Sequence, residues 1–151
     1  MIFKSPSPEV EIPDISWPEY FFDRLNSNLD NPALINAVTG DVTSYGEMKS
    51  AILTAAAALL RQGYRKGDVI AIYAPNSPEF VITFQAVLLF GGIITTVNPL
   101  YTSQELVQQL EHAGAVCLFT VPELLKKIDT GLDVTDIRDV FVYGAASENK
   151  G

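Results

Sequence analysis

The sequence contains a single cysteine and a single histidine among its 151 residues. With Cys117 alone, an internal disulfide is excluded, and the apolar surroundings of this residue predict an inert buried thiol rather than a nucleophile. With His112 alone, a metal centre built on several histidines and a paired-histidine site are excluded as well. His112 falls near the end of an expected helix, where a cation favours the helix dipole, so we interpret it as a capping or solvent-exposed residue.

Basic residues are also scarce. Ten lysines and arginines face 18 aspartates and glutamates, which gives a formal net charge of -8. This balance argues against nucleic acid as a partner, because non-specific binding needs a basic surface. It does not exclude a small local site for ATP or CoA. The hydrophobic fraction of 48% is enough to fill a core, so global disorder is not expected.

The common phosphate-binding patterns are missing. The sequence G-x-x-x-x-G-K-[ST] does not occur. Residues 65–68, RKGD, precede an expected strand and therefore lack the helix dipole that binds phosphate. Gly91-Gly92 follows a helix and leads into a strand, which is the wrong order for a dinucleotide-binding turn.

Four aspartates are spaced along an expected loop, without the pattern or glycine of an EF-hand. We interpret them as a solvated acidic loop: Asp129, Asp133, Asp136 and Asp139. The residues alone thus give no catalytic, cofactor-binding or metal-binding candidate.

No charged residue occurs in 80–104, and 80–97 is strongly apolar. A membrane-associated protein using 80–97 is one interpretation. Gly91-Gly92 interrupts the stretch, which favours a buried helix, a glycine turn and a buried strand, and hence no transmembrane span. The first residues lack the apolar region of a signal peptide, and the last three, NKG, are not a peroxisomal signal. We expect an intracellular protein, cytoplasmic or peroxisomal.

The pattern S/T-x-x-E, typical of a capping box, occurs four times and predicts four helix starts. Its instances are Ser16…Glu19, Ser44…Glu47, Thr102…Glu105 and Thr120…Glu123. Helices are expected at 17–26, 45–62 and 103–113, with a further helix at 78–90 capped by Ser77. In the helix that Thr102 caps, Leu106, Leu110 and Ala113 share one face, and Gly114 suits its end.

Short apolar segments between these helices predict strands at 69–73, 93–97, 116–119 and 140–143, and a hairpin at 33–44. Strands that alternate with helices favour an α/β fold with a mostly parallel sheet. Residues 1–15, punctuated by proline, are expected to be extended. The remaining residues, 16–151, are expected to form one incomplete domain.

Four blocks of sequence, in order, resemble the N-terminal segment of the AMP-forming acyl-CoA synthetases, nearest to their 4-coumarate–CoA ligase and luciferase-like branch. The blocks are PALI with TSYGEM (32–35, 43–48), GDVIA with NSPE (67–71, 76–79), LLFGGIITTVNP (88–99) and YTSQELVQQLEHAGAVCLFT (101–120). The resemblance runs from about Ser5 to Tyr143. Met48 and Ala113 are mild departures, where the family commonly has leucine and serine.

The resemblance implies the first part of a large α/β domain and a two-step reaction. A carboxylic acid reacts with ATP to give an acyl-adenylate, and CoA then displaces AMP to give a thioester, with Mg²⁺ offsetting phosphate charge. In this family the phosphate loop, the ribose-binding aspartate and the C-terminal lysine lie in motifs without a counterpart here. No site residue is therefore carried over, and we expect the isolated chain to be inactive and to need no cofactor.

Two interpretations from different classes follow. The first is a fragment of an ATP-dependent carboxylate–CoA ligase. The alternative is a non-catalytic interaction or regulatory protein on the same scaffold. Apolar surfaces meant for later segments would remain exposed in either case, so self-association is expected.

Overall fold

A four-stranded parallel sheet organises the fold in the computed structural model, which describes residues 6–8, 10–128 and 131–144. Its strands are β3 (Val69–Tyr73), β4 (Ile93–Val97), β5 (Ala115–Thr120) and β6 (Asp139–Val142), in the order β4-β3-β5-β6. All three pairings are parallel. The expected α/β fold with a parallel sheet is confirmed.

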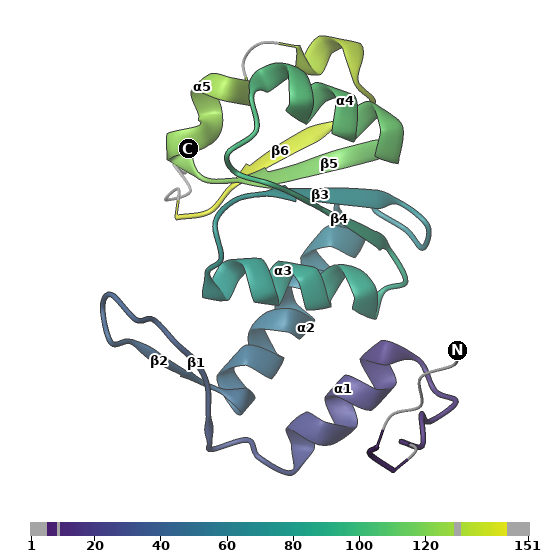
Figure 1. Cartoon of the computed structure of the whole chain (residues 1–151), viewed down its shortest axis with the longest axis vertical. Helices are drawn as coiled ribbons and strands as arrows, with labels where there is room; N and C mark the ends of the chain where they lie inside the picture. Colours follow the sequence, from purple (N-terminus) through teal and green to yellow (C-terminus); the bar gives the residue numbers. More distant parts are fainter. Residues whose placement is uncertain (1–5, 9, 129–130, 145–151) are drawn as a thin grey trace.

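Helices cover both faces of this sheet (Figure 1). One face carries α2 (Tyr45–Arg61) and α3 (Pro78–Leu89), and the other carries α4 (Ser103–Ala113) and the short α5 (Leu125–Ile128). Beyond α2 and α3 lie α1 (Trp17–Asn26) and the antiparallel hairpin of β1 (Pro32–Ile35) and β2 (Val42–Ser44). Two short 3-10 turns, η1 (Pro122–Leu124) and η2 (Leu132–Val134), complete the described elements.

Three of the four predicted helix starts are confirmed. Ser44 with Glu47 and Thr102 with Glu105 form complete capping boxes, in which each residue bonds the backbone of the other. Ser16 accepts only the hydrogen bond from the Glu19 N–H. These contacts span three residues, so the local sequence is enough to specify them.

The fourth prediction, at Thr120, is wrong. Thr120 is the buried last residue of β5, and its hydroxyl donates a 2.9 Å hydrogen bond to the Tyr73 carbonyl of the neighbouring strand. The turn that follows begins at Pro122 after Val121, without a side-chain cap. Because the Thr120 hydroxyl bonds the neighbouring strand, it does not cap a helix as the local pattern predicts.

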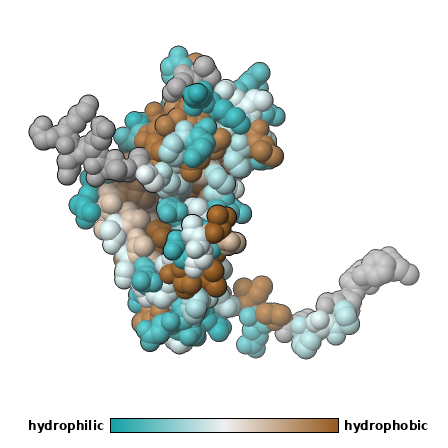
Figure 2. Space-filling model, turned by 90° about the vertical axis from the view of Figure 1, so that its left-hand side faces the viewer, coloured by the Kyte–Doolittle hydropathy of each residue, from teal (hydrophilic) through white to brown (hydrophobic). Residues whose placement is uncertain are grey.

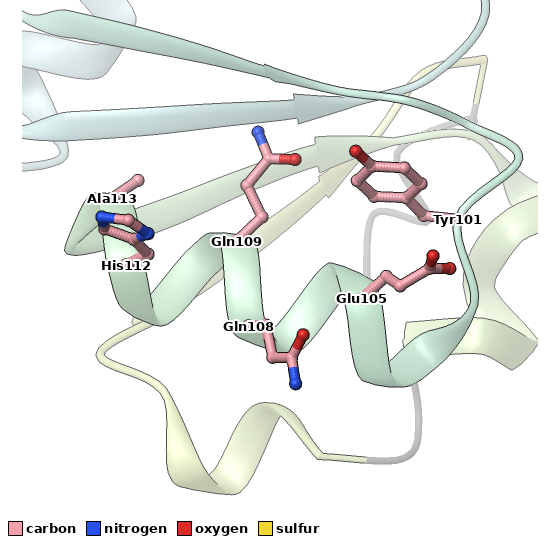
Figure 3. A pocket seen from close by; sticks show the side chains of 6 residues that line it. All are labelled: Tyr101, Glu105, Gln108, Gln109, His112 and Ala113. Carbon is pink, nitrogen blue, oxygen red and sulfur yellow. The ribbon is translucent and has the colours of Figure 1, made fainter.

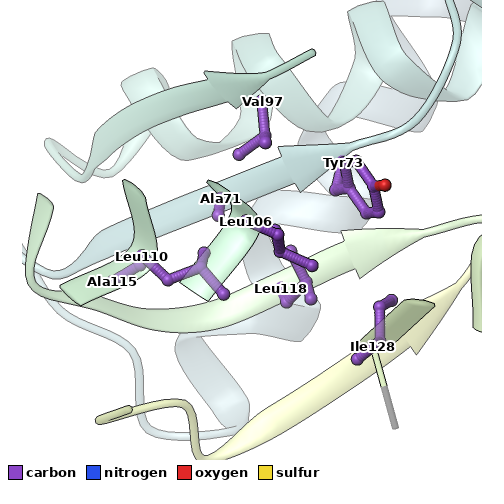
Figure 4. Packing of buried hydrophobic residues seen from close by; sticks show 8 residues of the cluster. All are labelled: Ala71, Tyr73, Val97, Leu106, Leu110, Ala115, Leu118 and Ile128. Atoms are coloured by element: carbon purple, nitrogen blue, oxygen red, sulfur yellow. The ribbon is translucent and has the colours of Figure 1, made fainter. Parts of the chain in front are cut away.

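The main core lies between the sheet and α4 (Figure 4). Leu106 and Leu110 of α4 are fully buried against the sheet, as their helical spacing predicts. The buried residues of this cluster are Ala71, Tyr73, Val97, Leu106, Leu110, Ala115, Leu118 and Ile128. A second cluster on the opposite face joins Leu59 of α2 and Val87 of α3 to Ile70 and Cys117 of the sheet.

The apolar stretch 80–97 forms most of α3, a glycine turn and β4, as expected. No residue from 80 to 90 is exposed, because α3 packs between the sheet and α1 and α2. Gly91 has a φ of 80°, which favours glycine. A Cβ at Gly92 would lie 2.7 Å from the Phe90 ring and 2.8 Å from the Val87 side chain, so these side chains would have to shift. Among the described residues no helix has the length and hydropathy needed to cross a bilayer.

The residues before α1 contain no helix or strand in their described part, 6–8 and 10–15. Val10 and Ile12 are 84% and 88% exposed, which means that this part of the segment buries little apolar surface. The space-filling view shows brown apolar areas interrupted by teal over the face that it presents (Figure 2). The division of the chain at residue 15 stays a prediction.

Candidate functional site at the carboxyl ends of the strands

Parallel sheets commonly bind ligands just beyond the carboxyl ends of their strands. Here β3, β4, β5 and β6 end at Tyr73, Val97, Thr120 and Val142, and parallel pairing places these ends along one edge. The segments that follow the strands therefore form the candidate site.

A polar network joins three of these strand ends. The Tyr73 hydroxyl donates a 2.9 Å hydrogen bond to the Tyr101 carbonyl in the loop after β4. Lys127 of α5 donates to the same carbonyl at 3.1 Å and to the Pro99 carbonyl at 3.3 Å. Thr120 extends the network by donating to the Tyr73 carbonyl. The bonds of Tyr73 and Lys127 to the loop carbonyls hold the loop 98–102 in position.

A broad surface depression of about 400 Å³ lies beside this network, along α4 (Figure 3). Glu105 is already engaged there, since its carboxylate accepts hydrogen bonds of 2.8 Å from both the N–H and the hydroxyl of Thr102. These bonds lower the pKa of Glu105. Gln109 points toward the sheet and donates to the Thr95 hydroxyl at 3.2 Å and the Thr96 carbonyl at 3.1 Å.

His112, the only histidine of the sequence, lies in the last turn of α4 and is exposed, as expected. It lines the same depression with Tyr101, Gln108 and Ala113. Within the part of the chain described by the structure, no hydrogen bond joins His112 to a nucleophile or to a carboxylate that would orient its ring. Among the described residues, the depression thus presents polar surface in which His112 is not hydrogen-bonded into an acid–base pair.

Cys117 lies on the opposite face of the sheet and is fully buried. The expected buried position is thus confirmed, and burial raises the pKa of its thiol to about 12, which keeps the thiol protonated at neutral pH. The neighbouring Tyr64 hydroxyl donates a hydrogen bond to the Asp139 carboxylate. Burial is the larger cause and this hydrogen bond the second, and both raise the pKa of Tyr64.

The prediction of an acidic loop at residues 129–139 is partly wrong. Asp139 begins β6 and accepts a hydrogen bond from Tyr64, and Asp133 lies in η2. Asp136 is exposed, whereas Asp129 lies outside the described residues. The described residues bring no group of three or more histidine, cysteine or acidic side chains together for a metal ion.

Residues 65–68 form a turn at the amino end of β3, as predicted. The Arg65 N–H donates to the Asp68 carboxylate at 2.8 Å, and Gly67 has a φ of 91°. The Arg65 guanidinium donates to the carbonyls of Leu60 and Tyr64 at 2.8 and 2.7 Å. This basic group is thus used to close the turn after α2.

Residues 21–150 match the family of AMP-binding enzymes. The chain belongs to the AMP-binding enzyme family. It is 41% identical over 84% of its length to 4-coumarate–CoA ligase 3 of Arabidopsis thaliana, and 37% identical over 93% to 4-coumarate–CoA ligase 3 of Oryza sativa subsp. japonica. The match covers 23% and 26% of these relatives, so the chain spans about a quarter of their length.

Solved structures agree on the fold of this member of the AMP-binding family. A long-chain-fatty-acid–CoA ligase from Archaeoglobus fulgidus superimposes with a TM-score of 0.88 at 24% identity, over 96% of this chain and 30% of that one. An anthranilate CoA ligase in complex with anthranoyl-AMP superimposes with a TM-score of 0.79 at 19% identity, over 86% and 25%. Most of both solved folds therefore has no counterpart in these residues.

The network of Tyr73, Thr120 and Lys127 was not predicted from the sequence. The expected strands did end at residues 73 and 97, as observed. The sequence therefore indicated which residues lie at the carboxyl edge of the sheet. Nothing local indicates that Lys127 binds the carbonyls of residues 99 and 101, because that contact depends on how α5 packs beside the loop.

Proposed function

We propose that this chain provides part of the scaffold of an ATP-dependent carboxylate–CoA ligase. In the complete enzyme, a carboxylate oxygen attacks the α-phosphorus of ATP and pyrophosphate leaves. The CoA sulfur then attacks the acyl carbon of the adenylate and AMP leaves. Mg²⁺ would offset the negative charge of the phosphates during the first step.

The observation that carries this proposal is the family match over residues 21–150, together with CoA-ligase relatives that are about four times as long. The contacts at the carboxyl edge fit a supporting role. Tyr73 and Lys127 bond the Tyr101 carbonyl and so hold the loop after β4, while Thr120 bonds the Tyr73 carbonyl of β3. Stabilising a transferring phosphate takes preorganised donors aimed at it, and these groups are already engaged.

We infer from this arrangement that the isolated chain does not activate carboxylic acids. The test is ATP–pyrophosphate exchange with a panel of aromatic and fatty acids, using purified chain free of host ligases. No exchange above a protein-free blank is expected. Exchange that is lost when this chain itself is mutated would overturn the inference.

A chimaera tests the ligase function directly. This chain replaces the matched region of the Arabidopsis relative, and CoA-thioester formation is measured with ATP, Mg²⁺, CoA and a carboxylic acid. Activity of a folded chimaera supports the proposal. A folded but inactive chimaera instead favours the alternative of a non-catalytic interaction protein on the same scaffold.

Two further expectations belong to this proposal. Because ATP and CoA are intracellular metabolites, we place the protein inside the cell, in the cytoplasm or the peroxisome. We also infer that the isolated chain self-associates, since large apolar side chains such as Ile35, Val42 and Val140 are 64%, 54% and 37% exposed. Light scattering against protein concentration measures this association.

A further inference from the structure

The dipeptide Ser-Pro occurs three times in the sequence, at 5–6, 7–8 and 77–78. A serine followed directly by proline is the acceptor that proline-directed protein kinases recognise, and the proposed ligase function makes no use of any of the three. Ser5 lies outside the described residues, whereas Ser7 and Ser77 are both described. The fold places these two serines in opposite settings.

Ser7 lies in a segment that is accessible from solvent. Every described residue from 6 to 17 is exposed, and those before α1 belong to no helix or strand. The apolar side chains of Val10 and Ile12 are exposed as well. The segment lies beside the start of α1 and away from the sheet (Figure 1). A kinase can therefore bind it without disturbing the core.

The backbone around Ser7 also suits a kinase, which holds the residues on either side of the acceptor in an extended conformation. Pro8 favours this conformation at Ser7, because its ring disfavours the helical region for the residue before it. Pro13 acts in the same way on Ile12. Because proline can neither continue a helix nor donate to a strand ladder, the two prolines also oppose regular structure in the segment.

Ser77 has the same dipeptide in a protected position. It is the N-cap of α3, and its hydroxyl oxygen accepts a 3.2 Å hydrogen bond from the Phe80 N–H. Pro78 is the first residue of α3, and both Ser77 and Pro78 are partly buried. A kinase could extend the residues after Ser77 only by unwinding the first turn of this helix, so the fold should protect Ser77.

We propose that Ser7 is a phosphorylation site for a proline-directed kinase that uses ATP. In the transfer, the Ser7 hydroxyl oxygen attacks the γ-phosphorus of ATP and forms a new oxygen–phosphorus bond. The bond from this phosphorus to the bridging oxygen of the β-phosphate breaks, and ADP leaves. The hydroxyl proton passes to the catalytic base of the kinase.

The modification adds charge to the surface and leaves the core unchanged. Phosphoserine carries a charge of about -1.5 to -2 at pH 7, which takes the net charge of the chain from -8 to about -10. The described residues of the segment include Glu11 and Asp14 but no lysine or arginine, so the segment itself offers the phosphate no ion pair. The thermal midpoint of the phosphorylated chain should equal that of the unmodified chain, and a clear fall would contradict the peripheral position of Ser7.

The test incubates the full 151-residue chain with ATP, Mg²⁺ and a kinase of the cyclin-dependent or mitogen-activated type, and peptide mass spectrometry locates the phosphate. Ser7 should react within about twofold of the rate in a free peptide of residues 1–15, because the segment needs no unfolding. Absence of phosphate at Ser7 with both kinases would overturn the proposal, whether or not the peptide reacts.

Ser77 provides an internal control in the same reaction. It should react about tenfold or more slowly in the folded chain than in a free peptide of residues 71–84, because the start of α3 must open first. A folded chain that is phosphorylated at Ser77 and not at Ser7 would show that accessibility does not select the site, and would contradict the proposal.

Two proline variants test the recognition of the dipeptide, and circular dichroism confirms that each is folded. Pro8→Ala should slow phosphorylation of Ser7 by about tenfold or more, the scale on which one specificity contact discriminates. Pro13→Ala, in the same exposed segment, is the matched control and should not. Equal rates for Pro8→Ala and the wild type would exclude a proline-directed kinase.

Protein expressed in eukaryotic cells tests whether the site is used there. In chain purified with phosphatase inhibitors, the peptide containing Ser7 should carry one phosphate that phosphatase removes, and Ser7→Ala should lack it. An unmodified peptide, or one that carries a sugar at Ser7, would count against the proposal.

Discussion

The Tyr64 hydroxyl donates a hydrogen bond to the carboxylate of Asp139, 75 residues further along the chain. The bond ties the turn after α2 to the first residue of β6, the strand at the sheet edge. Tyr64 is only 2% exposed, so its hydroxyl needs a partner inside the protein. The buried thiol of Cys117 lies next to the same hydroxyl.

Tyr64→Phe should destabilise the chain by about 1 to 2 kcal/mol, because it removes a hydrogen bond to a charged group while keeping the ring. Urea denaturation followed by circular dichroism measures the loss. Asp139→Asn is the control, since the amide oxygen still accepts the bond, and it should cost less. Equal stability of wild type and Tyr64→Phe would show that the bond contributes nothing.

Alkaline pH should destabilise the fold. Burial raises the pKa of Cys117 from 9.0 to about 12, and burial with the Asp139 bond raises the pKa of Tyr64. Both groups lose protons more readily when unfolded, so their contribution to stability is complete below pH 9 and is lost progressively as the pH rises toward 12. The urea midpoint should fall over this range.

Cys117→Ala serves as the control for this pH dependence. It should reduce the slope of the urea midpoint against pH above pH 9, whatever it does to stability at neutral pH, since one of the ionising groups is removed. The same slope in both proteins would mean that Cys117 does not take part.

Thr102→Ala should lower stability by about 1 kcal/mol, the usual cost of losing an N-cap. A fall in the thermal midpoint measures it. Glu105→Gln keeps a side chain that can complete the capping box and should be milder than Glu105→Ala. No change with either Thr102→Ala or Glu105→Ala would contradict the capping role.

The capping box also predicts an acid dependence. Hydrogen bonds from Thr102 lower the pKa of Glu105 below 4.5, so this carboxylate stabilises the fold above that pH and loses its effect as the pH falls through the lowered value. The difference in stability between wild type and Glu105→Gln should therefore shrink in acid. A difference that is constant from neutral pH to below 4.5 would count against it.

Val87→Asp should prevent soluble expression, because it places an unpaired charge in the fully buried cluster of Leu59, Ile70 and Cys117. The cost is several kcal/mol. Val38→Asp, the same change at a 94% exposed position, should express as well as the wild type. Comparing the soluble fractions of the two variants checks the prediction, and a soluble, folded Val87→Asp would refute it.

Most of the secondary structure was predictable because its signals are local. The helix that begins at Ser103 was specified by Thr102 and Glu105 at its start and by Gly114 at its end, all within one or two turns of it. The strand at 69–73 was specified by five successive apolar or aromatic residues between turns. The family resemblance also rests on short local blocks of sequence, and the family match over residues 21–150 confirms it.

The tertiary structure alone decided the contacts between distant residues. The local sequence around Thr120 is that of a helix cap, but the Tyr73 carbonyl of β3 lies beside it and accepts a hydrogen bond from its hydroxyl. The sequence predicts that Asp139 lies in a solvated loop, but the position of β6 places its carboxylate within hydrogen-bonding distance of the Tyr64 hydroxyl. Capping depends on residues three apart, whereas these bonds depend on the strand order β4-β3-β5-β6, which is set by burial of whole faces rather than by local sequence.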